Sequence, residues 1–375
     1  MVVYNWQQED WPDFRYNLEK VEPQLFEYAQ KAGQAQGISQ ALPPEIQIDQ
    51  VLHVMVEEAI KTSEIEGVYL SRKDVISSIR KNLGLEAEGV QIRDVKARGI
   101  AEMLMDARKT FQEPLSHPKL FEWHSLLMAK ATDIEIGKYR THPEPMQVVS
   151  GAAGKDKVHF EAPPSEHVPG EMDKFIRWFN ETAPDGSLVI HAGPIRSAIA
   201  HLYFETIHPF EDGNGRVGRA IAEKVLSQHL NYPVLFSLSG AIESKKNEYY
   251  NALEEAQRSN EITSWINYFV ETILAAQASA AEQIEYTLRK SKFFDRYHEH
   301  LNDRQLKVIL RMFEEGPGGF KGGMNATKYI SIAKTSKATA TRDLQELVSR
   351  GILIPSGAGG RSTSYELRLV PQETK

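Results

Sequence analysis

The sequence predicts a mainly α-helical protein that carries two short β-hairpins. Apolar residues recur three and four positions apart along most of the chain, which is the spacing of one helix face. Short alternating pieces flank a Gly/Lys/Asp turn within 146–163 and a Gly-rich turn within 352–369. With 375 residues, 41% of them hydrophobic, the chain is long enough to form more than one compact part.

Residues 1–112 are predicted to form an N-terminal helical region, and the segment 44–67 shows the clearest helical pattern there. The apolar face of this segment consists of Ile48, Val51, Leu52, Met55, Val56, Ala59 and Ile60. Gly67 fits the position of a helix C-cap, where glycine commonly ends a helix. We therefore expect the helix to end near Glu66.

Residues 113–278 are predicted to form a central helical core around the stretch HPFEDGNGRVGR, His208–Arg219. Two segments with helical spacing flank this stretch, and their apolar faces comprise Ile195, Ala198, Ile199, Leu202 and Thr206 before it and Val217, Ile221, Val225 and Leu230 after it. The stretch should therefore join two helices, and the hairpin predicted at 146–163 precedes both.

The C-terminal part is predicted to be a winged helix over 299–375, joined to the core by a polar helical linker, 279–298. Helices within 325–351 followed by the hairpin at 352–369 give the order helix, turn, helix, wing. Residues 301–375 carry 12 Lys and Arg against 7 Asp and Glu, a net charge of +5, whereas the rest of the chain carries −12. Candidate phosphate contacts are Lys334, Lys337, Arg342 and Arg361. Docking of a protein partner and dimerisation remain alternatives to DNA binding.

Composition excludes several classes of function. The chain has no apolar run near 20 residues and begins without a basic and hydrophobic leader, so we expect no membrane partner and a cytoplasmic location. It contains no cysteine, which excludes disulfides and thiolate metal sites. Any metal must therefore be held by oxygen or imidazole ligands.

The loop at 208–219 combines groups that suit phosphate chemistry. Its glycines fit the dinucleotide pattern G-x-G-x-x-G, but that site requires a strand before the loop, and here a helix is predicted. What remains is a glycine turn that feeds a helix N-terminus, where backbone N–H groups bind phosphate. Arg216 and Arg219 could clamp an anion, Asp212 could hold Mg²⁺, and His208 could accept a proton. Together these roles indicate phosphoryl or nucleotidyl transfer.

At these residues the sequence resembles the Fic (Fido) family, whose signature H-P-F-x-[DE]-G-N-G-R-x-x-R matches at every fixed position from His208 to Arg219. The resemblance implies that 113–278 is a Fic catalytic core that transfers AMP from ATP to a Ser, Thr or Tyr hydroxyl of a protein. It implies that His208 deprotonates the hydroxyl and Asp212 holds Mg²⁺. The α- and β-phosphates would be bound by Gly213, Asn214, Gly215 and Arg216, and the γ-phosphate by Arg219.

The same resemblance implies functions for two more segments. The hairpin at 146–163 lies where Fic proteins carry a flap, and a target protein could add a strand to its edge. The segment KKNEYYNALEEAQ is similar to the family's nucleoside-contacting helix, which indicates Tyr250 and, two turns later on the same face, Gln257.

The stretch TSEIEG, residues 62–67, matches the inhibitory pattern [ST]-x-x-x-E-[GN] of autoinhibited Fic proteins at Thr62, Glu66 and Gly67. The resemblance implies that Glu66 pairs with Arg219 in place of the γ-phosphate. We expect a bidentate carboxylate–guanidinium pair that keeps ATP from being presented in line.

Other functions remain open. The same site could remove AMP from modified proteins, with Glu66 positioning a water. Alternatively, the chain could be a DNA-binding regulator whose core senses nucleotide without turnover, although such a sensor has no need of a base such as His208. The donor nucleotide, the target and a homodimeric state are not determined by the sequence.

Overall fold

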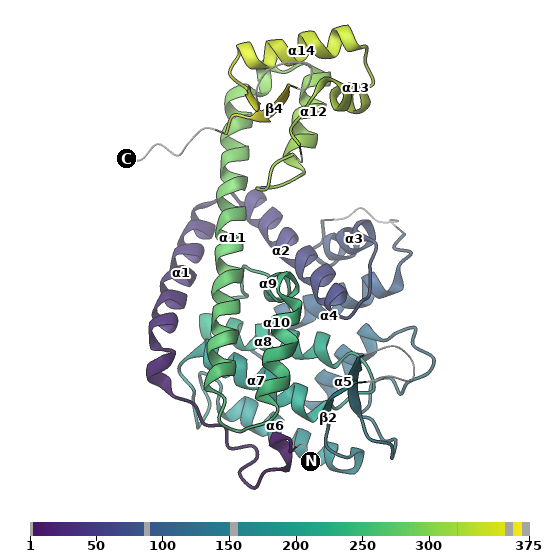
Figure 1. Cartoon of the computed structure of the whole chain (residues 1–375), viewed down its shortest axis with the longest axis vertical. Helices are drawn as coiled ribbons and strands as arrows, with labels where there is room; N and C mark the ends of the chain where they lie inside the picture. The colour runs from purple at the N-terminus through teal and green to yellow at the C-terminus, as the bar shows by residue number, and fades with distance from the viewer. Residues whose placement is uncertain (1–2, 86–90, 151–156, 321, 357–362, 370–375) are drawn as a thin grey trace. The chain divides into compact units, whose positions relative to one another are not determined.

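The computed structural model describes residues 3–85, 91–150, 157–320, 322–356 and 363–369. The chain divides into two compact units, 1–278 and 279–375. Both units are mostly helical, and the described strands form two small antiparallel sheets of two strands each (Figure 1). The predicted fold class, mainly helical with β-hairpins, is confirmed.

The first unit is built from helices with one hairpin inserted among them. In chain order its elements are η1 Asn5–Gln7, η2 Leu18–Lys20, α1 Glu22–Ala41, α2 Pro44–Ile65, α3 Arg72–Asn82, α4 Val95–Lys109, α5 His117–Leu127, β1 Gln147–Ser150, β2 Lys157–Glu161, η3 Ser165–His167, α6 Val168–Glu181, α7 Gly193–Ile207, α8 Asn214–Leu230, α9 Leu238–Ser244 and α10 Lys246–Ala256. Helix α11, Thr263–Tyr297, begins in this unit and contains the boundary at residues 278 and 279.

The centre of the first unit is the pair α7 and α8. Every residue of α7 is buried, which is typical of a helix surrounded on all sides. The expected faces of the two helices pack into one core, and Met55, Val56 and Ala59 of α2 belong to the same core as Val217 and Ile221 of α8. The predicted N-terminal region 1–112 is therefore not a separate body, because its apolar face has no core of its own to cover.

Helix α2 ends as the sequence predicts. Its last helical residue is Ile65, and Gly67 adopts a positive φ of 73°. The amide of Val68 donates to the carbonyl of Ser63, and the amide of Gly67 donates to that of Glu64. These two bonds are a Schellman motif, which terminates a helix with a left-handed glycine. The motif fixes the backbone on either side of Glu66.

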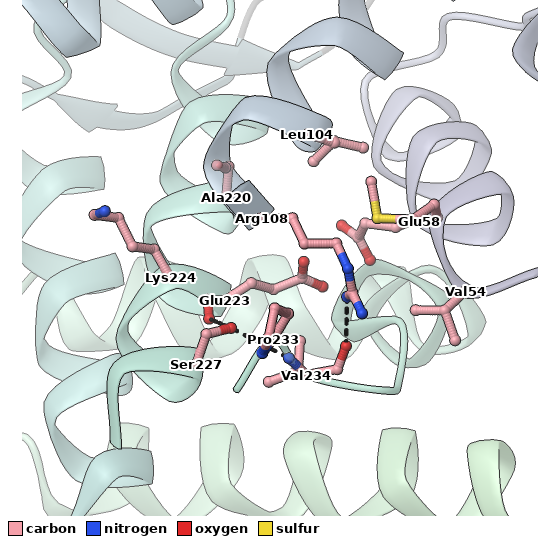
Figure 2. A pocket seen from close by; sticks show the side chains of 12 residues that line it. Val54, Glu58, Leu104, Arg108, Ala220, Glu223, Lys224, Ser227, Pro233 and Val234 are labelled. Carbon is pink, nitrogen blue, oxygen red and sulfur yellow. Dashed lines mark hydrogen bonds between the residues drawn. The ribbon is translucent and has the colours of Figure 1, made fainter. Parts of the chain in front are cut away.

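A small cavity of about 20 Å³ lies where α2, α4 and α8 meet the segment after α8 that contains Pro233 and Val234 (Figure 2). Glu58 of α2 accepts hydrogen bonds from Ser237 Oγ at 2.7 Å, from the Ser239 amide at 2.9 Å and from Ser239 Oγ. Beside it, Glu223 of α8 accepts from the amide of Leu238 at 3.3 Å. These carboxyl groups take successive amides at the N-terminus of α9, where the helix dipole favours negative charge.

The hairpin predicted at 146–163 is present. Strands β1 and β2 pair antiparallel, with Gln147 opposite Glu161 and Val148 opposite Phe160, and a bulge lies between Val148 and Val149. Residues 151–156 of the predicted turn lie outside the described part of the chain.

The second unit contains three short helices and a hairpin. Its elements after α11 are η4 His298–His300, α12 Asp303–Phe313, α13 Ala326–Ala333, α14 Lys337–Ser349, β3 Leu353–Ser356 and β4 Ser364–Leu367. The segment 279–298, expected to be a linker, is helical as predicted but contributes Tyr286 and Phe293 to the core of this unit. It is therefore part of the unit, because both rings are buried against Phe313. Arg361, a predicted phosphate contact, lies outside the described residues.

Candidate active site

His208 directly follows α7 in a left-handed conformation, with φ 50° and ψ 58°. Its Nδ1 lies 3.4 Å from the carbonyl oxygen of Glu205, so the tautomer that donates from Nδ1 leaves Nε2 as an acceptor. Burial, helped by the nearby Arg140 guanidinium, lowers the pKa of His208 to about 4. At neutral pH this imidazole is uncharged and able to take up a proton.

The backbone around His208 is fixed by buried polar side chains. Arg140 donates from Nε to the carbonyl of His208 at 2.8 Å and from NH2 to that of Ile207 at 3.2 Å. The side chain of Asn214 spans the loop, because Oδ1 accepts from the Phe210 amide at 2.9 Å and Nδ2 donates to the Phe210 carbonyl at 2.7 Å. Phe210 is fully buried and stacks on His124, with ring centroids 4.1 Å apart. The side chain of Asn214, a predicted phosphate ligand, therefore holds the loop, and its backbone N–H at the start of α8 is the donor best placed for phosphate.

The turn into α8 has the geometry of an anion site. Gly213 adopts a φ of 84°, which aims successive amides at the helix N-terminus in one direction. Arg216 is buried, and its NH2 lies 3.1 Å from Asp212 Oδ1, which also accepts from the Gly213 amide at 2.5 Å. The side chain of Asp212 is 57% exposed. One exposed carboxylate beside a phosphate cradle fits Mg²⁺, which takes one or two carboxylates and completes its shell with phosphate oxygens and water.

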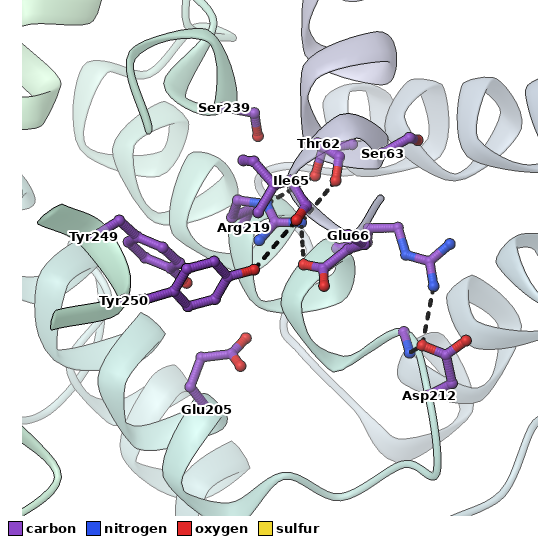
Figure 3. Close-up of polar contacts among 12 residues, drawn as sticks. Thr62, Ser63, Ile65, Glu66, Glu205, Asp212, Arg219, Ser239, Tyr249 and Tyr250 are labelled. Carbon is purple, nitrogen blue, oxygen red and sulfur yellow. Dashed lines mark hydrogen bonds and ion pairs between the residues drawn. The ribbon is translucent and has the colours of Figure 1, made fainter. Parts of the chain in front are cut away.

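Arg219 is enclosed by the end of α2 (Figure 3). Its NH2 donates to Glu66 Oε1 at 2.8 Å and to the Thr62 carbonyl at 2.9 Å, and its Nε donates to Thr62 Oγ1 at 2.8 Å. The expected bidentate pair is not seen: one Glu66 oxygen accepts from NH2, and Thr62 Oγ1 accepts from Nε, which excludes a pair formed side-on through Nε and NH2. Burial alone would lower the pKa of Arg219, but the Glu66 carboxylate offsets this and the net pKa is raised.

Gly215 makes this contact possible. A Cβ at this position would clash with Glu66 Oε1 and would lie 3.0 Å from Arg219 NH1. The signature glycine therefore serves the approach of the Glu66 carboxylate to the loop as well as the loop itself.

The predicted nucleoside residues lie on α10 and at its end. Tyr250 is 37% exposed, and its hydroxyl donates to the Ile65 carbonyl of α2 at 3.2 Å. Gln257 caps α10 and is buried, and its Nε2 donates to the Glu205 carbonyl at 3.4 Å. The two side chains therefore differ: Tyr250 borders the site beside Glu66, whereas Gln257 is part of its buried wall.

Comparison with known proteins agrees with this geometry. Residues 114–226 match the family described as Fic/DOC, and residues 4–85 match a family described only as a domain of unknown function. The chain contains a Fic domain. Crystal structures of a Fic family protein from Desulfovibrio desulfuricans and of a Fic domain containing signaling protein from Bacteroides thetaiotaomicron share its fold. The first has a TM-score of 0.53 at 19% identity and covers 96% of this chain and 99% of its own. The second has a TM-score of 0.54 at 20% identity and covers 70% and 97%.

Relatives of the Fic domain carry the name protein adenylyltransferase. A probable protein adenylyltransferase of Aquifex aeolicus is 35% identical over 99 residues, or 26% of this chain and 27% of the relative. Protein adenylyltransferase Fic of Drosophila yakuba is 23% identical over 270 residues, or 68% and 49%. This chain thus matches about a quarter to a half of the length of these relatives. Among the described residues, no helix combines the length and apolarity needed to cross a membrane.

Three buried groups next to the 208–219 loop were not predicted from the sequence: Glu205, His201 and Tyr249. Glu205, one turn before His208, is buried, and burial raises its pKa to about 8 despite the Arg219 charge. His201 donates to or accepts from the Tyr249 hydroxyl at 2.8 Å, and burial lowers its pKa to about 3. A Cβ at Gly218 would clash with Glu205. The only signal in the sequence was polar residues inside an apolar helix, which does not distinguish a site from a core network.

Proposed function

We propose that this chain is an autoinhibited protein adenylyltransferase that transfers AMP from ATP to a Ser, Thr or Tyr hydroxyl of a target protein. The observation that carries the proposal is the neutral, fixed imidazole of His208 beside the glycine turn of α8 and two buried arginines. The names of the relatives support the same reaction.

In the proposed reaction, His208 Nε2 takes the proton of the target hydroxyl as its oxygen forms a bond to the α-phosphorus. The bond from the α-phosphorus to the bridging oxygen breaks, and pyrophosphate leaves. The amides of Gly213, Asn214 and Gly215 and the guanidinium of Arg216 would hold the α- and β-phosphates. Mg²⁺, held by Asp212, would supply charge neutralisation on the phosphates.

The target protein would add an extended segment to the hairpin of β1 and β2, since a two-stranded hairpin leaves edges for strand addition. Val149 and Val158 of this hairpin are exposed large apolar side chains. They would contact the side chains of the added segment, while main-chain bonds would present its hydroxyl to His208.

Glu66 would act as the brake. Its carboxylate accepts a hydrogen bond from Arg219, which would otherwise bind the γ-phosphate. The same carboxylate lies so close to Gly215 that a Cβ there would clash with it. ATP bound without that arginine would not place its α-phosphate in line with the incoming hydroxyl.

The test uses Glu66→Gly as the parent enzyme, with labelled ATP and a cell lysate. His208→Ala in this parent should reduce labelling by about 10²–10⁴, the usual loss of a general base, while ATP binding remains. His167→Ala, which changes an exposed histidine on η3, is the matched control. Labelling at the parent rate by the His208 variant would contradict the mechanism. Release of AMP from a modified target, rather than labelling, would favour the reverse reaction.

We also propose that the second unit is a winged helix that binds duplex DNA through α14. The exposed residues of this helix include Lys337, Thr341, Arg342 and Gln345, which are side chains that contact phosphates and bases. Its acidic residues are turned to their own unit: Asp343 is buried and accepts from Arg304 and Tyr329, and Glu346 pairs with Arg350. An exposed helix face without acidic charge fits a polyanion better than a protein surface of mixed charge.

Full-length protein should bind a duplex with an affinity that falls steeply as salt rises. Charge reversal at Lys337 and Arg342 should lower the slope of log affinity against log salt by about 2, one for each phosphate contact. Lys307→Glu, on the exposed side of α12, should have little effect. Absence of binding at low salt would favour a protein-docking or dimerisation role.

A further inference from the structure

The segment Tyr4–Gln8 connects three elements that border the candidate active site. The amide of Asn5 donates to the carbonyl of Gln257 at the end of α10 at 2.9 Å. Its Nδ2 lies 3.4 Å from Thr206 Oγ1, two residues before His208. The indole Nε1 of Trp6 donates to the Glu161 carbonyl of β2 at 2.8 Å. Two adjacent residues therefore tie the hairpin to α7 and α10.

Asn5 is built into the protein interior. It is fully buried, its Oδ1 accepts from the Trp6 amide at 2.8 Å, and its carbonyl accepts from Asn260 Nδ2 at 3.3 Å. All of its polar groups are thus used, as burial requires. The backbone at Asn5 cannot shift without breaking several of these bonds, which fixes the position of Trp6.

The end of β2 is held on consecutive residues. Tyr4 packs its ring edge-on against Phe160 with centroids 5.0 Å apart, and Trp6 binds the next residue, Glu161. Arg258 donates to the His159 carbonyl at 3.0 Å and lies 4.8 Å from the centroid of the Tyr4 ring. Tyr4, Phe160 and Ala162 form a small buried cluster with Trp6, Met146 and Val148 against it. The base of the hairpin therefore rests on Tyr4 and Trp6.

The following residues anchor the segment elsewhere. Trp11 Nε1 donates to Glu171 Oε2 of α6 at 2.8 Å, and the Trp11 ring packs edge-on against Tyr203 of α7. The Arg15 amide donates to the Asn260 carbonyl at 2.7 Å. The segment is thus fixed to the helical core independently of its contacts with the hairpin.

We propose that the segment Tyr4–Gln8 is a positioning element for the hairpin, with Trp6 as the residue that sets the hairpin relative to His208. This rests on the proposed function, in which the hairpin presents the target hydroxyl. This role would assign a function to the start of the region 4–85, which matches a domain of unknown function.

The proposed role predicts which kinetic constant changes. The hydrogen bonds described for Trp6 involve Asn5 and Glu161 rather than residues 208–219, so loss of the bond to Glu161 should leave the phosphate site intact. A looser hairpin must be ordered when the target segment is added, and this raises KM for the protein target. KM for ATP should stay the same.

The first experiment measures hydrogen exchange of the full chain without any substrate. Trp6→Phe keeps an aromatic ring and removes the N–H donor, and it should raise exchange at the amides of β1 and β2 while those of α7 and α8 stay protected. Trp11→Phe is the matched control, because Trp11 lies just after the segment and its indole hydrogen bond has the same 2.8 Å length but reaches α6 instead of the hairpin. Unchanged hairpin exchange in Trp6→Phe, or an equal rise in both variants, overturns the proposal.

The second experiment is kinetic and uses Glu66→Gly as the parent. Trp6→Phe should raise KM for the protein target about 3- to 10-fold, as expected for one neutral hydrogen bond, with little change in KM for ATP. Trp11→Phe should change neither. A fall in kcat with both KM values unchanged would count against positioning. If the parent transfers no nucleotide, the proposed function fails, and the exchange experiment still decides the role of Trp6.

Discussion

Helices α2 and α8 meet through two carboxyl contacts that differ in nearly every physical respect. The outer contact joins Glu66 to Arg219 at the mouth of the site (Figure 3). The inner contact brings Glu58 beside Glu223 around the cavity, two turns earlier on α2 and one turn later on α8 (Figure 2). One contact pairs opposite charges, whereas the other brings together two groups of the same charge type.

The outer contact is suited to exchange. Glu66 keeps 29% of its side chain exposed, while Arg219 is 1% exposed and has two further bonds to Thr62. An incoming phosphate could replace the Glu66 oxygen without exposing or freeing the arginine. If Glu66 acts as the proposed brake, its release would require movement of the Glu66 side chain only.

The inner contact is suited to permanence. Glu58 is buried, with acceptor bonds from two serine hydroxyls and one amide. Burial, and then the Glu58 carboxylate, raise the pKa of Glu223 well above its usual range, which favours a proton held between the two carboxyl groups. The inner contact therefore fixes α2 against α8, and in the proposed mechanism the outer contact is the one that changes.

The largest expected effect on labelling comes from replacing each partner of the outer contact, Arg219 and Glu66, in turn. Arg219→Ala should lower labelling by about 10²–10³, the loss typical of one transition-state donor. Glu66→Gly should instead raise auto-modification and target labelling at least about tenfold, which corresponds to about 1.4 kcal/mol. The double variant should behave like Arg219→Ala, measured with labelled ATP. Unchanged labelling by a folded Glu66→Gly protein would show that Glu66 is not a brake.

Breaking the inner contact should change stability more than activity. Glu58→Ala leaves Ser237, Ser239 and the Ser239 amide without their acceptor, and we expect a loss of about 3–5 kcal/mol in the free energy of unfolding. Glu66→Gln keeps an acceptor for Arg219 and should cost less than about 1 kcal/mol. Urea unfolding of the two variants measures both values. Similar losses would mean that the inner contact is not what secures α2.

A pH series sharpens the comparison by isolating the shared proton. Because the folded-state pKa of Glu223 is raised above the ordinary value of 4.5, its contribution to stability is full below about pH 4.5. It is lost as pH rises through the folded-state pKa. Glu223→Gln imitates the protonated group, so wild type should lose stability relative to this variant as the pH rises above about 4.5 and through the folded-state pKa of Glu223. A difference that stays constant over this range would exclude a shared proton.

The smallest effect is expected from removing the hydrogen bond between Arg219 Nε and Thr62 Oγ1. We expect this bond to form both when Glu66 binds Arg219 and when ATP does. Thr62→Val removes the hydroxyl that accepts from Arg219 Nε and keeps the Thr62 carbonyl contact. In the Glu66→Gly background it should lower labelling about 2- to 10-fold, since Arg219 is less well oriented for ATP. Thr62→Ser keeps the hydroxyl and should restore activity. If Thr62→Val matches its parent, Thr62 serves the inhibited state alone.

Local patterns in the sequence determined the helix that ends at Ile65, the helices on either side of 208–219 and the hairpin at 146–163, and they predicted phosphate chemistry for the loop. Each of these depends on residues close together in the chain: apolar spacing, a glycine with positive φ, or a signature of twelve consecutive residues. The positive φ of Gly67 and of Gly213 accounts for a glycine at each turn, and at Gly213 an added Cβ would also lie 3.0 Å from Leu127 Cδ2.

Contacts between distant segments were decided by the tertiary structure alone. Helix α2 of the predicted N-terminal region 1–112 shares one core with α8. Tyr286 and Phe293 of the predicted linker 279–298 belong to the core of the second unit. Thr62, 157 residues from Arg219 in the sequence, accepts the Nε donor of Arg219, while Glu66 accepts from NH2 with one oxygen. Such pairings depend on which buried polar groups remain unsatisfied once the helices pack, and that is a property of the whole fold rather than of any stretch of sequence.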